Sequence, residues 1–329
     1  MAKKMIAKPL SLIAISLVVL VSANSSAITI DSGDRSKFQK DSLHWVTLGE
    51  LRPTQPVIAH DQVNYKIGAF SKKSEKMYEG LCESYGAGEE VLSWSGNSTP
   101  ADPESFTCAN DIGSIKKDIN TVIVGPDGKL YLTDGHHSFS TFFDMKEGGA
   151  NLPVYIRVQE NWSTEESMTA FWQKLEQNNN SWPYLPNGSK VSYQAMPTSL
   201  GRVALENDPY RGLMYFARKI GWDKKKAPKI NYLEFHWANE FRNSIPFSEA
   251  DRKNPEAYLA KIKAISEAII ELDADHMIGS SGYTAKGLAQ KKEWNKKSEK
   301  EFNALLCKGD KKGKLGYALE AQGISVQCQ

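Results

Sequence analysis

The chain has 329 residues and a formal net charge of +2, and 40% of its residues are hydrophobic. This is enough apolar material for one large domain or two smaller ones. A charge so close to neutrality does not indicate a general DNA-binding protein, because such proteins carry an excess of lysine and arginine that neutralises phosphates.

The amino-terminal end predicts a secretory signal peptide. Lys3, Lys4 and Lys8 precede a short apolar run that ends in small residues, and we expect cleavage after Ala27 or Ala23. An uncleaved membrane anchor is the alternative, although the run is shorter than the roughly 20 residues that span a bilayer. Cleavage removes three lysines and no acidic residue, so the net charge falls from +2 to −1. We therefore expect an exported protein, periplasmic or secreted, with no transmembrane segment after cleavage.

The four cysteines agree with export, because an even number of cysteines in an oxidising compartment indicates disulfide bonds. We expect two local bridges, Cys82 with Cys108 and Cys307 with Cys328. Each would close a loop of roughly 20–27 residues and stabilise the fold by roughly 3 kcal/mol in the chain-entropy model. Spacing alone leaves the other two pairings open, and the cysteines lie too far apart in sequence to indicate a local zinc site.

Residues 41–160 combine strand and helix patterns. The predicted elements, in chain order, are a strand over 44–48, a helix over 60–85, an insertion loop over 89–118, two strands joined by a Pro126-Asp127-Gly128 turn over 121–133, a helix over 138–145 and a strand over 152–158. Together they predict a small mixed α/β domain.

Beyond Trp162 the pattern is mostly helical. The predicted helices cover 164–175, 209–220, 232–243, 254–272 and a last, lysine-rich stretch over 284–306. Ser163 or Thr164 is the expected cap of the first one. The sequence therefore predicts an α+β fold in three parts, namely a signal peptide at 1–27, the mixed α/β domain at 41–160 and a helical C-terminal region at 161–329 packed on that domain.

A carboxylate, a glycine and two histidines lie together at one strand-to-helix junction, in the order Asp134, Gly135, His136 and His137. The first turn of a helix has unpaired N–H groups and the positive end of the helix dipole, which favours an anion. Histidines add hydrogen-bond donors, general acid–base groups or metal ligands. The alternative is a tight turn whose histidines only cap the helix.

Three ordered motifs carry a family resemblance. They are Leu48-Gly-Glu-Leu-Arg-Pro-Thr-Gln-Pro-Val57, then Leu130-Tyr-Leu-Thr-Asp-Gly-His-His137, and then Asp208-Pro-Tyr-Arg211 with Glu234-Phe-His-Trp-Ala238. This set resembles the ParB/sulfiredoxin superfamily and, more narrowly, its ParB-like nuclease group. The resemblance implies a ParB/sulfiredoxin-like fold for residues 41–160. It also implies a nuclease-like activity, which in this group is inferred from distant relatives.

Asp134, His136 and His137 are the expected catalytic residues, and Asp134 could hold a divalent cation, orient a histidine or act as a base. His137 is favoured as the histidine that faces the ligand, because it lies nearer the helix end where an anion would bind. Gly135 and Ser138 would complete the anion site. Relatives with nucleotide chemistry place an arginine where this chain has Ser138, which can cap the helix but carries no charge.

The loop of the first motif faces this turn in relatives, so Arg52, Thr54 and Gln55 are expected to bind substrate. Arg52 would replace the missing arginine as a phosphate partner, or else be an exposed surface arginine. A related free-serine kinase places a catalytic glutamate at the position of Gln55. Because glutamine cannot act as a base, a kinase mechanism is not expected.

In the second half of the chain, Arg211 or His236 is expected to reach across and complete the cleft. The alternative is that Arg211 with Glu234, and Asp208, form buried ion pairs that only hold helices together. Further along, residues 286–314 contain ten lysines and four acidic residues. A solvated helix face is the ordinary interpretation of such a run, and a surface for a polyanion is the other.

Three functions from different classes follow. The first is a metal-assisted phosphodiester hydrolase in which Asp134 and His137 hold a divalent ion such as Mg²⁺ or Mn²⁺, and a phosphate-containing ligand or nucleic acid is the substrate. Exported proteins meet little ATP, which favours hydrolysis over phosphoryl transfer. The second is a non-catalytic module that binds a nucleotide or another anion. A secreted factor that docks through its lysine-rich helix is a third, and no protein partner is indicated.

Overall fold

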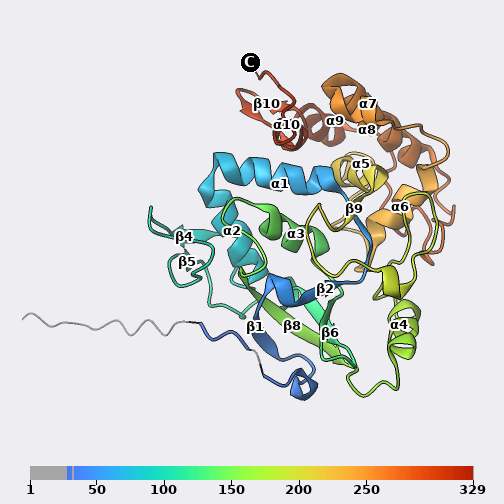
Figure 1. The fold of residues 1–329 in the computed structure, drawn as a ribbon. Coiled ribbons are helices and arrows are strands. Elements are labelled where there is room, and N and C mark those ends of the chain that lie inside the picture. Colours follow the sequence, from blue (N-terminus) through green and yellow to red (C-terminus); the bar gives the residue numbers. More distant parts are fainter. Residues whose placement is uncertain (1–27, 32, 329) are drawn as a thin grey trace, which may run out of the picture.

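A five-stranded mixed sheet forms one end of the molecule (Figure 1). The structure, a computed structural model, describes residues 28–31 and 33–328, so the expected signal peptide and its cleavage sites lie outside the described residues. The strands follow one another across the sheet as β1 (Leu43–Thr47), β8 (Pro153–Asn161), β6 (Thr121–Val124), β7 (Leu130–Leu132) and β2 (Leu51–Pro53). The pairs β8–β6 and β7–β2 are parallel, whereas β1–β8 and β6–β7 are antiparallel.

The two faces of the sheet bury different side chains, because successive residues of a strand point to opposite sides. Leu130 and Leu132 of β7 face a core that is shared with α1 (His60–Lys72), α2 (Ser74–Ser84) and α3 (His136–Asp144). Tyr131 points to the other face, where it packs on Phe171 of α4 (Met168–Gln177). Together with the helices of the second half, this sheet confirms the α+β class.

Short elements connect and extend this domain. The expected insertion loop contains a hairpin, β4 (Val91–Ser93) with β5 (Thr107–Cys108), and β3 (Val57–Ile58) pairs in parallel with β9 (Glu206–Asn207). The second of these pairs joins the two halves of the chain. Single 3₁₀ turns lie at Arg35–Lys37, Leu48–Glu50, Lys116–Asp118 and Tyr193–Ala195.

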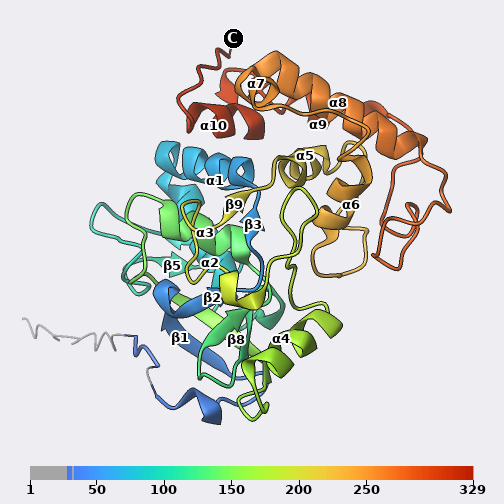
Figure 2. The same ribbon diagram turned by 45° about the vertical axis from the view of Figure 1, so that its right-hand side comes forward.

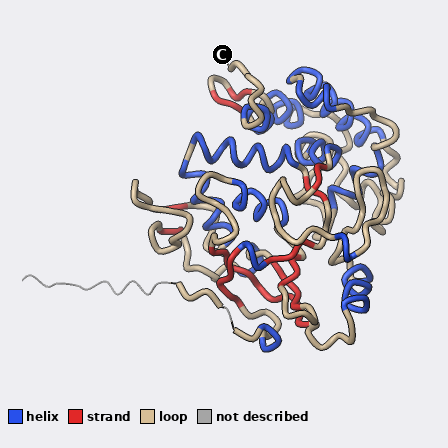
Figure 3. The backbone as a smooth tube through the Cα atoms, in the orientation of Figure 1, coloured by secondary structure: helices blue, strands red, loops and turns tan. Residues whose placement is uncertain are grey.

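The C-terminal half is mostly helical, as expected, and most helices lie at the opposite end from the sheet (Figure 3). Its elements are α5 (Pro209–Ala217), α6 (Leu233–Phe241), α7 (Glu249–Lys253), α8 (Pro255–Glu271), α9 (Lys296–Asn303), the hairpin β10 (Cys307–Lys308) with β11 (Lys311–Lys312), and α10 (Lys314–Glu320). Trp222, Trp237 and Tyr258 are fully buried in a second apolar core. No helix in the described part of the chain is both long and apolar enough to cross a bilayer.

Helix α10 lies along α1, so the end of the chain covers an early helix (Figures 1 and 2). The approach is close because Gly68 has no side chain, and a Cβ there would lie 2.5 Å from the Tyr317 carbonyl oxygen. At the start of α1, buried Asp61 accepts two hydrogen bonds from Arg252 of α7, at 2.7 and 3.1 Å, and one from the Tyr258 hydroxyl at 2.7 Å. A buried carboxylate with these partners fixes the C-terminal helices on the first domain.

Both expected disulfides are present, Cys82–Cys108 with a Cα–Cα distance of 5.5 Å and Cys307–Cys328 with 5.6 Å. The first ties the insertion hairpin to α2, and the second holds the β10–β11 hairpin to the end of the chain.

Several predicted helices differ from the observed ones. The helix expected over 60–85 is two helices, because residues 71–76 are all exposed and the chain turns at Lys73. The long helix expected over 284–306 is wrong, since Ala289 has a left-handed φ of 61° and Asn295 caps a short α9. The helix expected at 164 begins at Met168, capped by Ser167.

Candidate functional site

The DGHH turn (residues 134–137) joins β7 to α3 through a left-handed glycine. Gly135 has a φ of 89° and is the N-cap residue of α3, which begins at His136. A Cβ at this position would lie 2.3 Å from the Asn120 side chain, so neither the backbone conformation nor the space admits another residue. Ser138 is therefore the third residue of the helix, and the expectation that it caps the helix is wrong.

His136 is buried and joins the turn to the loop after β2. Its Nε2 accepts a hydrogen bond from the Thr54 backbone N–H at 3.1 Å. The Thr54 hydroxyl donates to the Leu132 carbonyl at 2.7 Å and lies 3.2 Å from the Tyr232 hydroxyl. Tyr232 precedes α6 with a left-handed φ of 59°, which is uncommon for a bulky residue. The first motif, the turn and the second half of the chain therefore meet at Thr54.

His137 makes the matching contact one residue later. Its Nε2 accepts a hydrogen bond from the Ala59 backbone N–H at 2.9 Å, just before α1. With Nε2 as acceptor in both rings, Nδ1 carries the proton of each neutral imidazole. Burial lowers the pKa of His136 to about 3, and burial together with the charge of Arg211 holds the pKa of His137 well below its ordinary value. Both histidines are therefore neutral at pH 7 and brace the loop between β2 and α1.

Three cations surround one buried carboxylate beside His137. This Glu234 cluster consists of Glu234 of α6, Arg211 of α5, Arg218 and Lys224. Glu234 forms ion pairs with Arg211 at 3.5 Å, with Lys224 at 3.3 Å and with Arg218. Burial raises the pKa of Glu234, but the three cations outweigh burial and hold that pKa well below its ordinary value. The cluster therefore keeps a net positive charge at pH 7.

The guanidinium groups of the cluster retain hydrogen-bonding capacity. Burial lowers the pKa of Arg211 to about 10, so this side chain stays charged at pH 7. Its Nη1 donates to Gln62 at 2.9 Å. Within the part of the chain that the structure describes, the Nε atoms of Arg211 and Arg218 are buried without a hydrogen-bond partner. The Nε atoms of Arg35 and Arg157, outside the cluster, are in the same state, so these donors are available to an acceptor but do not by themselves indicate one.

The other predicted site residues divide into two groups. Asp134 and Ser138 are exposed at the turn, and the Asp134 carboxylate accepts the Gly135 N–H at 2.7 Å. Gln55 is buried and donates to the Val57 carbonyl at 2.5 Å, so it stabilises its own loop. Arg52 donates to the Gly49 carbonyl at 3.0 Å, and the structure does not bring it to the turn.

Of the two residues of the second half that were expected to complete the cleft, only Arg211 reaches the turn. Arg211 also forms the expected buried pair with Glu234. Asp208 caps α5 and accepts two hydrogen bonds from Arg242, at 3.0 and 2.6 Å, so this pair holds α5 to α6. His236 packs edge-on against Trp182 rather than in the cluster.

Arg218, Lys224 and Tyr232 belong to the site but were not singled out from the sequence. Arg218 follows the last turn of α5, and Lys224 lies in a run of three lysines that suggests only a solvated surface. Tyr232 lies two residues before the Glu234-Phe-His-Trp-Ala238 part of the third motif, and this closeness is the one local signal that could have found it.

The two expected metal ligands, Asp134 and His137, both take part in hydrogen bonds. Asp134 is exposed and its Oδ1 accepts a backbone hydrogen bond, while His137 Nε2 accepts one from the Ala59 N–H. The described residues contain no group of three or more His, Cys, Asp and Glu side chains arranged to hold a metal ion. In this arrangement His137 Nε2 is therefore not available to a metal ion.

The mixed sheet, the glycine turn and the two histidines at the start of α3 define a ParB-like α+β protein. The family described as "Putative ParB-like nuclease" matches residues 44–243. The chain belongs to this ParB-like nuclease family. The match includes all three motifs and the Glu234 cluster, and it ends before α7.

A solved structure supports the fold. The crystal structure of protein Atu1540 from Agrobacterium tumefaciens is similar to this chain with a TM-score of 0.50 and 19% sequence identity. The similarity covers 73% of this chain and 96% of that one. At this identity the likeness concerns the fold alone. No curated protein matches the sequence.

Proposed function

We propose that this protein is an exported, nuclease-like phosphodiester hydrolase whose phosphate site lies between the DGHH turn and the Glu234 cluster. The observation that carries the proposal is the gathering of Arg211, Arg218 and Lys224 around a single buried carboxylate. Their excess positive charge, next to the first turn of α3, attracts a phosphate. Membership in the ParB-like nuclease family supports this class of substrate.

Each group has a distinct part in this proposal. Arg211 and Arg218 would hold the phosphate oxygens through their unpartnered Nε–H groups. His136 and His137 would act as positioning residues, because their acceptor nitrogens already bind the backbone of Thr54 and Ala59. Asp134 is the exposed carboxylate of the turn and would accept the proton of the attacking water or hold a divalent ion. Such an ion would neutralise charge on the scissile phosphate.

A non-catalytic anion-binding module is the second candidate. The observation that favours it is that both imidazoles are held as hydrogen-bond acceptors, so neither is free to act as a base in this arrangement. Under this alternative Asp134 has no role in turnover, and the Glu234 cluster alone determines affinity.

The decisive experiment uses the mature protein with both disulfides intact. It is incubated with single- and double-stranded DNA, RNA and a chromogenic phosphodiester, in Mg²⁺, Mn²⁺ or EDTA. The variants are Asp134→Asn and Arg218→Met, with Asp127→Asn in the remote β6–β7 turn as the matched control. Cleavage that disappears in Asp134→Asn and persists in Asp127→Asn supports the hydrolase. Phosphate-ligand binding without cleavage, weakened only by Arg218→Met, supports the module.

Export is part of the same proposal, and the two disulfides support it because such bonds persist in oxidising compartments. The test is to express the complete chain and determine the amino-terminal residue of the protein recovered outside the cytoplasm. A first residue of Asn24 or Ile28 agrees with the expected cleavage. Full-length protein retained in the cytoplasm contradicts it.

A further inference from the structure

A basic pocket of about 450 Å³ lies on the side of α1 that α10 covers. It is enclosed by α1, the end of α5, α9, the β10–β11 hairpin and the start of α10. Eight of its seventeen lining residues are lysine or arginine, and one is acidic. Much of this charge comes from the lysine-rich segment of the sequence. That segment is folded into the wall of a pocket rather than into a single solvated helix.

This basic pocket, called the lysine pocket below, also has apolar and aromatic lining residues. Tyr65, Phe216 and Tyr317 line it together with aliphatic side chains, and Phe216 is only 1% exposed. Burial raises the pKa of Tyr65 to about 12, so its hydroxyl remains a hydrogen-bond donor at neutral pH. A volume of this size that is lined by both rings and cations suits a ligand with a flat apolar part and several negative charges.

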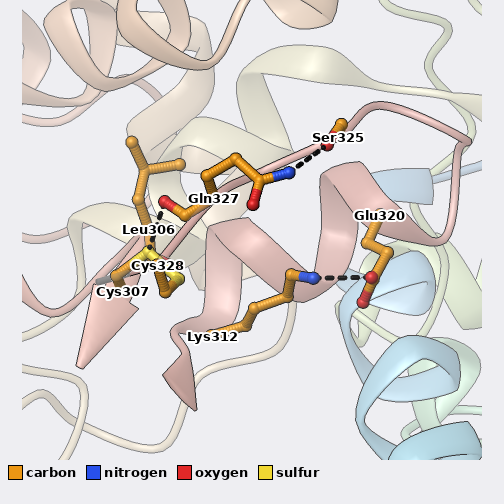
Figure 4. Close-up of a disulfide and its surroundings, with 7 residues drawn as sticks. All are labelled: Leu306, Cys307, Lys312, Glu320, Ser325, Gln327 and Cys328. Carbon is orange, nitrogen blue, oxygen red and sulfur yellow. Dashed lines mark hydrogen bonds and ion pairs between the residues drawn. A yellow bond between two sulfur atoms is a disulfide. The ribbon is translucent and has the colours of Figure 1, made fainter. Parts of the chain in front are cut away.

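Most of the pocket cations lack an acidic partner. Lys76 pairs with Glu79, Arg218 with the Glu234 cluster, and Lys312 with Glu320 at 2.5 Å (Figure 4). Among the described residues, no carboxylate lies within 4.0 Å of the amine of Lys73, Lys300, Lys308, Lys311 or Lys314. The single acidic lining residue, Glu301, lies 3.9 Å from Lys219. The pocket therefore has an excess of positive charge that its few acidic neighbours balance only in part.

Lys314 carries its charge in a largely buried position close to other cations. Its amine lies 5.6 Å from the centre of the Tyr215 ring. Burial, with the nearby positive charges, lowers the pKa of Lys314 to about 8. The charged groups that face it are Lys219, Arg218 and Lys66, which lower this pKa, and Glu301, which raises it. A ligand with negative charge would relieve this repulsion.

We propose that the lysine pocket binds a nucleotide, with its phosphates on the lysines of the β10–β11 hairpin and α10 and its base on the partly exposed rings of Tyr65 and Tyr317. The nucleotide is either free or the end of a single strand, since both present the same chemistry. This site is separate from the DGHH turn, and the two share only Arg218. The inference goes beyond the proposed hydrolase activity and does not require it.

The Cys307–Cys328 disulfide stabilises one wall of this pocket. Cys307 precedes Lys308 in β10, and Lys312 of β11 is drawn toward Glu320 of α10 on the same side (Figure 4). Because the bridge fixes the hairpin to the chain end at Cys328, it also fixes the positions of Lys308 and Lys311.

Calorimetric titration tests the proposal on the mature, disulfide-bonded protein in EDTA. The probes are ATP, adenosine, inorganic pyrophosphate, an oligothymidylate and a glutamate-rich peptide. We expect ATP or the oligothymidylate to bind more tightly than adenosine, pyrophosphate or the peptide. The double variant Lys308→Ser/Lys311→Ser should weaken that binding about tenfold. The matched control, Lys292→Ser/Lys296→Ser, removes the same charge from exposed positions outside the pocket and should change affinity by less than about twofold.

Three outcomes overturn the proposal, namely equal weakening by both double variants, tightest binding of the peptide, and no saturable binding of any nucleotide. A second readout is the pH dependence of affinity. Binding to the wild type should weaken above pH 8, where Lys314 loses its proton, and Lys314→Arg should remove that dependence. Asp134→Asn leaves the pocket unchanged and should retain ATP binding, so a failure of the hydrolase proposal remains distinguishable from a failure of this one.

Discussion

The protein has two cation-rich regions that are built in opposite ways. In the Glu234 cluster, three cations share one buried carboxylate, and each is held by an ion pair. In the lysine pocket, eight basic side chains face one acidic residue, and most have no carboxylate within reach among the described residues. The cluster therefore has fixed geometry and partly balanced charge, whereas the pocket keeps an unbalanced field. The first arrangement suits positioning of a phosphate, and the second suits its attraction.

Removal of the carboxylate from each region should give the largest difference in stability between the two regions. Glu234→Gln leaves Arg211 buried without its counter-charge, so we expect the free energy of unfolding to fall by about 3–5 kcal/mol in urea titrations. Glu301→Gln removes the acid of the pocket, which is partly exposed and only loosely paired, and should change stability by less than about 1 kcal/mol. Equal losses for the two variants would contradict the difference described here.

The DGHH turn, which lies beside the Glu234 cluster, depends on one glycine. Gly135→Ala combines an unfavourable φ with a clash against Asn120 and should cost about 1–3 kcal/mol, measured by chemical denaturation. Gly128→Ala has a similar φ of 70° but open space around its Cβ, so it isolates the backbone contribution of about 1 kcal/mol. Asn120→Ala added to Gly135→Ala should restore part of the loss, and failure to do so would argue against the steric cause.

The cost of unbalanced charge in the pocket can be measured through Lys314. Its pKa is lower in the folded protein than in the unfolded chain, so the unfolded state binds the proton more tightly and the charge destabilises the fold below pH 8. Lys314→Met should therefore stabilise the protein by about 1 kcal/mol at pH 7. The gain should shrink as the pH rises from about 8 to 10.5, whereas Lys296→Met should show no such trend.

The smallest expected difference between the two regions is the dependence of stability on salt concentration. Added salt screens repulsion among the exposed pocket lysines, so the wild type should gain a few tenths of a kcal/mol, on the order of 0.3 kcal/mol, on going from low to high ionic strength. Lys308→Ser/Lys311→Ser should lose that gain. A salt dependence that is the same in the wild type and in this variant would place the repulsion elsewhere.

The elements with strong local patterns could be predicted from the sequence. The strand at 44–48, the hairpin over 121–133 and both local disulfides are observed with small shifts at their ends. The predictions failed where packing, and not the local sequence pattern, determines the structure. The polar stretch at 71–76 contains a break between two helices at Lys73 that helical spacing did not reveal, and the lysine-rich run at 284–306 contains only a short helix.

Only the part of the site that adjacent residues form could be predicted from the sequence. The DGHH turn and its glycine could be recognised because four adjacent residues define them. Arg218 and Lys224 reach Glu234 from separate positions in the second half, and nothing in their own surroundings in the sequence distinguishes them from surface cations. The bonds that occupy both histidine acceptors come from Thr54 and Ala59, about 80 residues earlier, so only the fold reveals them.

The packing of α10 on α1 has a consequence for how the chain folds during synthesis. Gln322 donates to Asp61 at 3.2 Å across a separation of 261 residues, and Tyr317 lies against Gly68. The Gly68 face of α1 therefore stays uncovered until residues 314–322 have been made, whereas α2, α3 and α5 can cover its other sides earlier. Contacts between such distant segments form late, because the loop that they close must be ordered first. A chain that lacks α10 would expose the Gly68 face of α1 to solvent and to other unfinished chains.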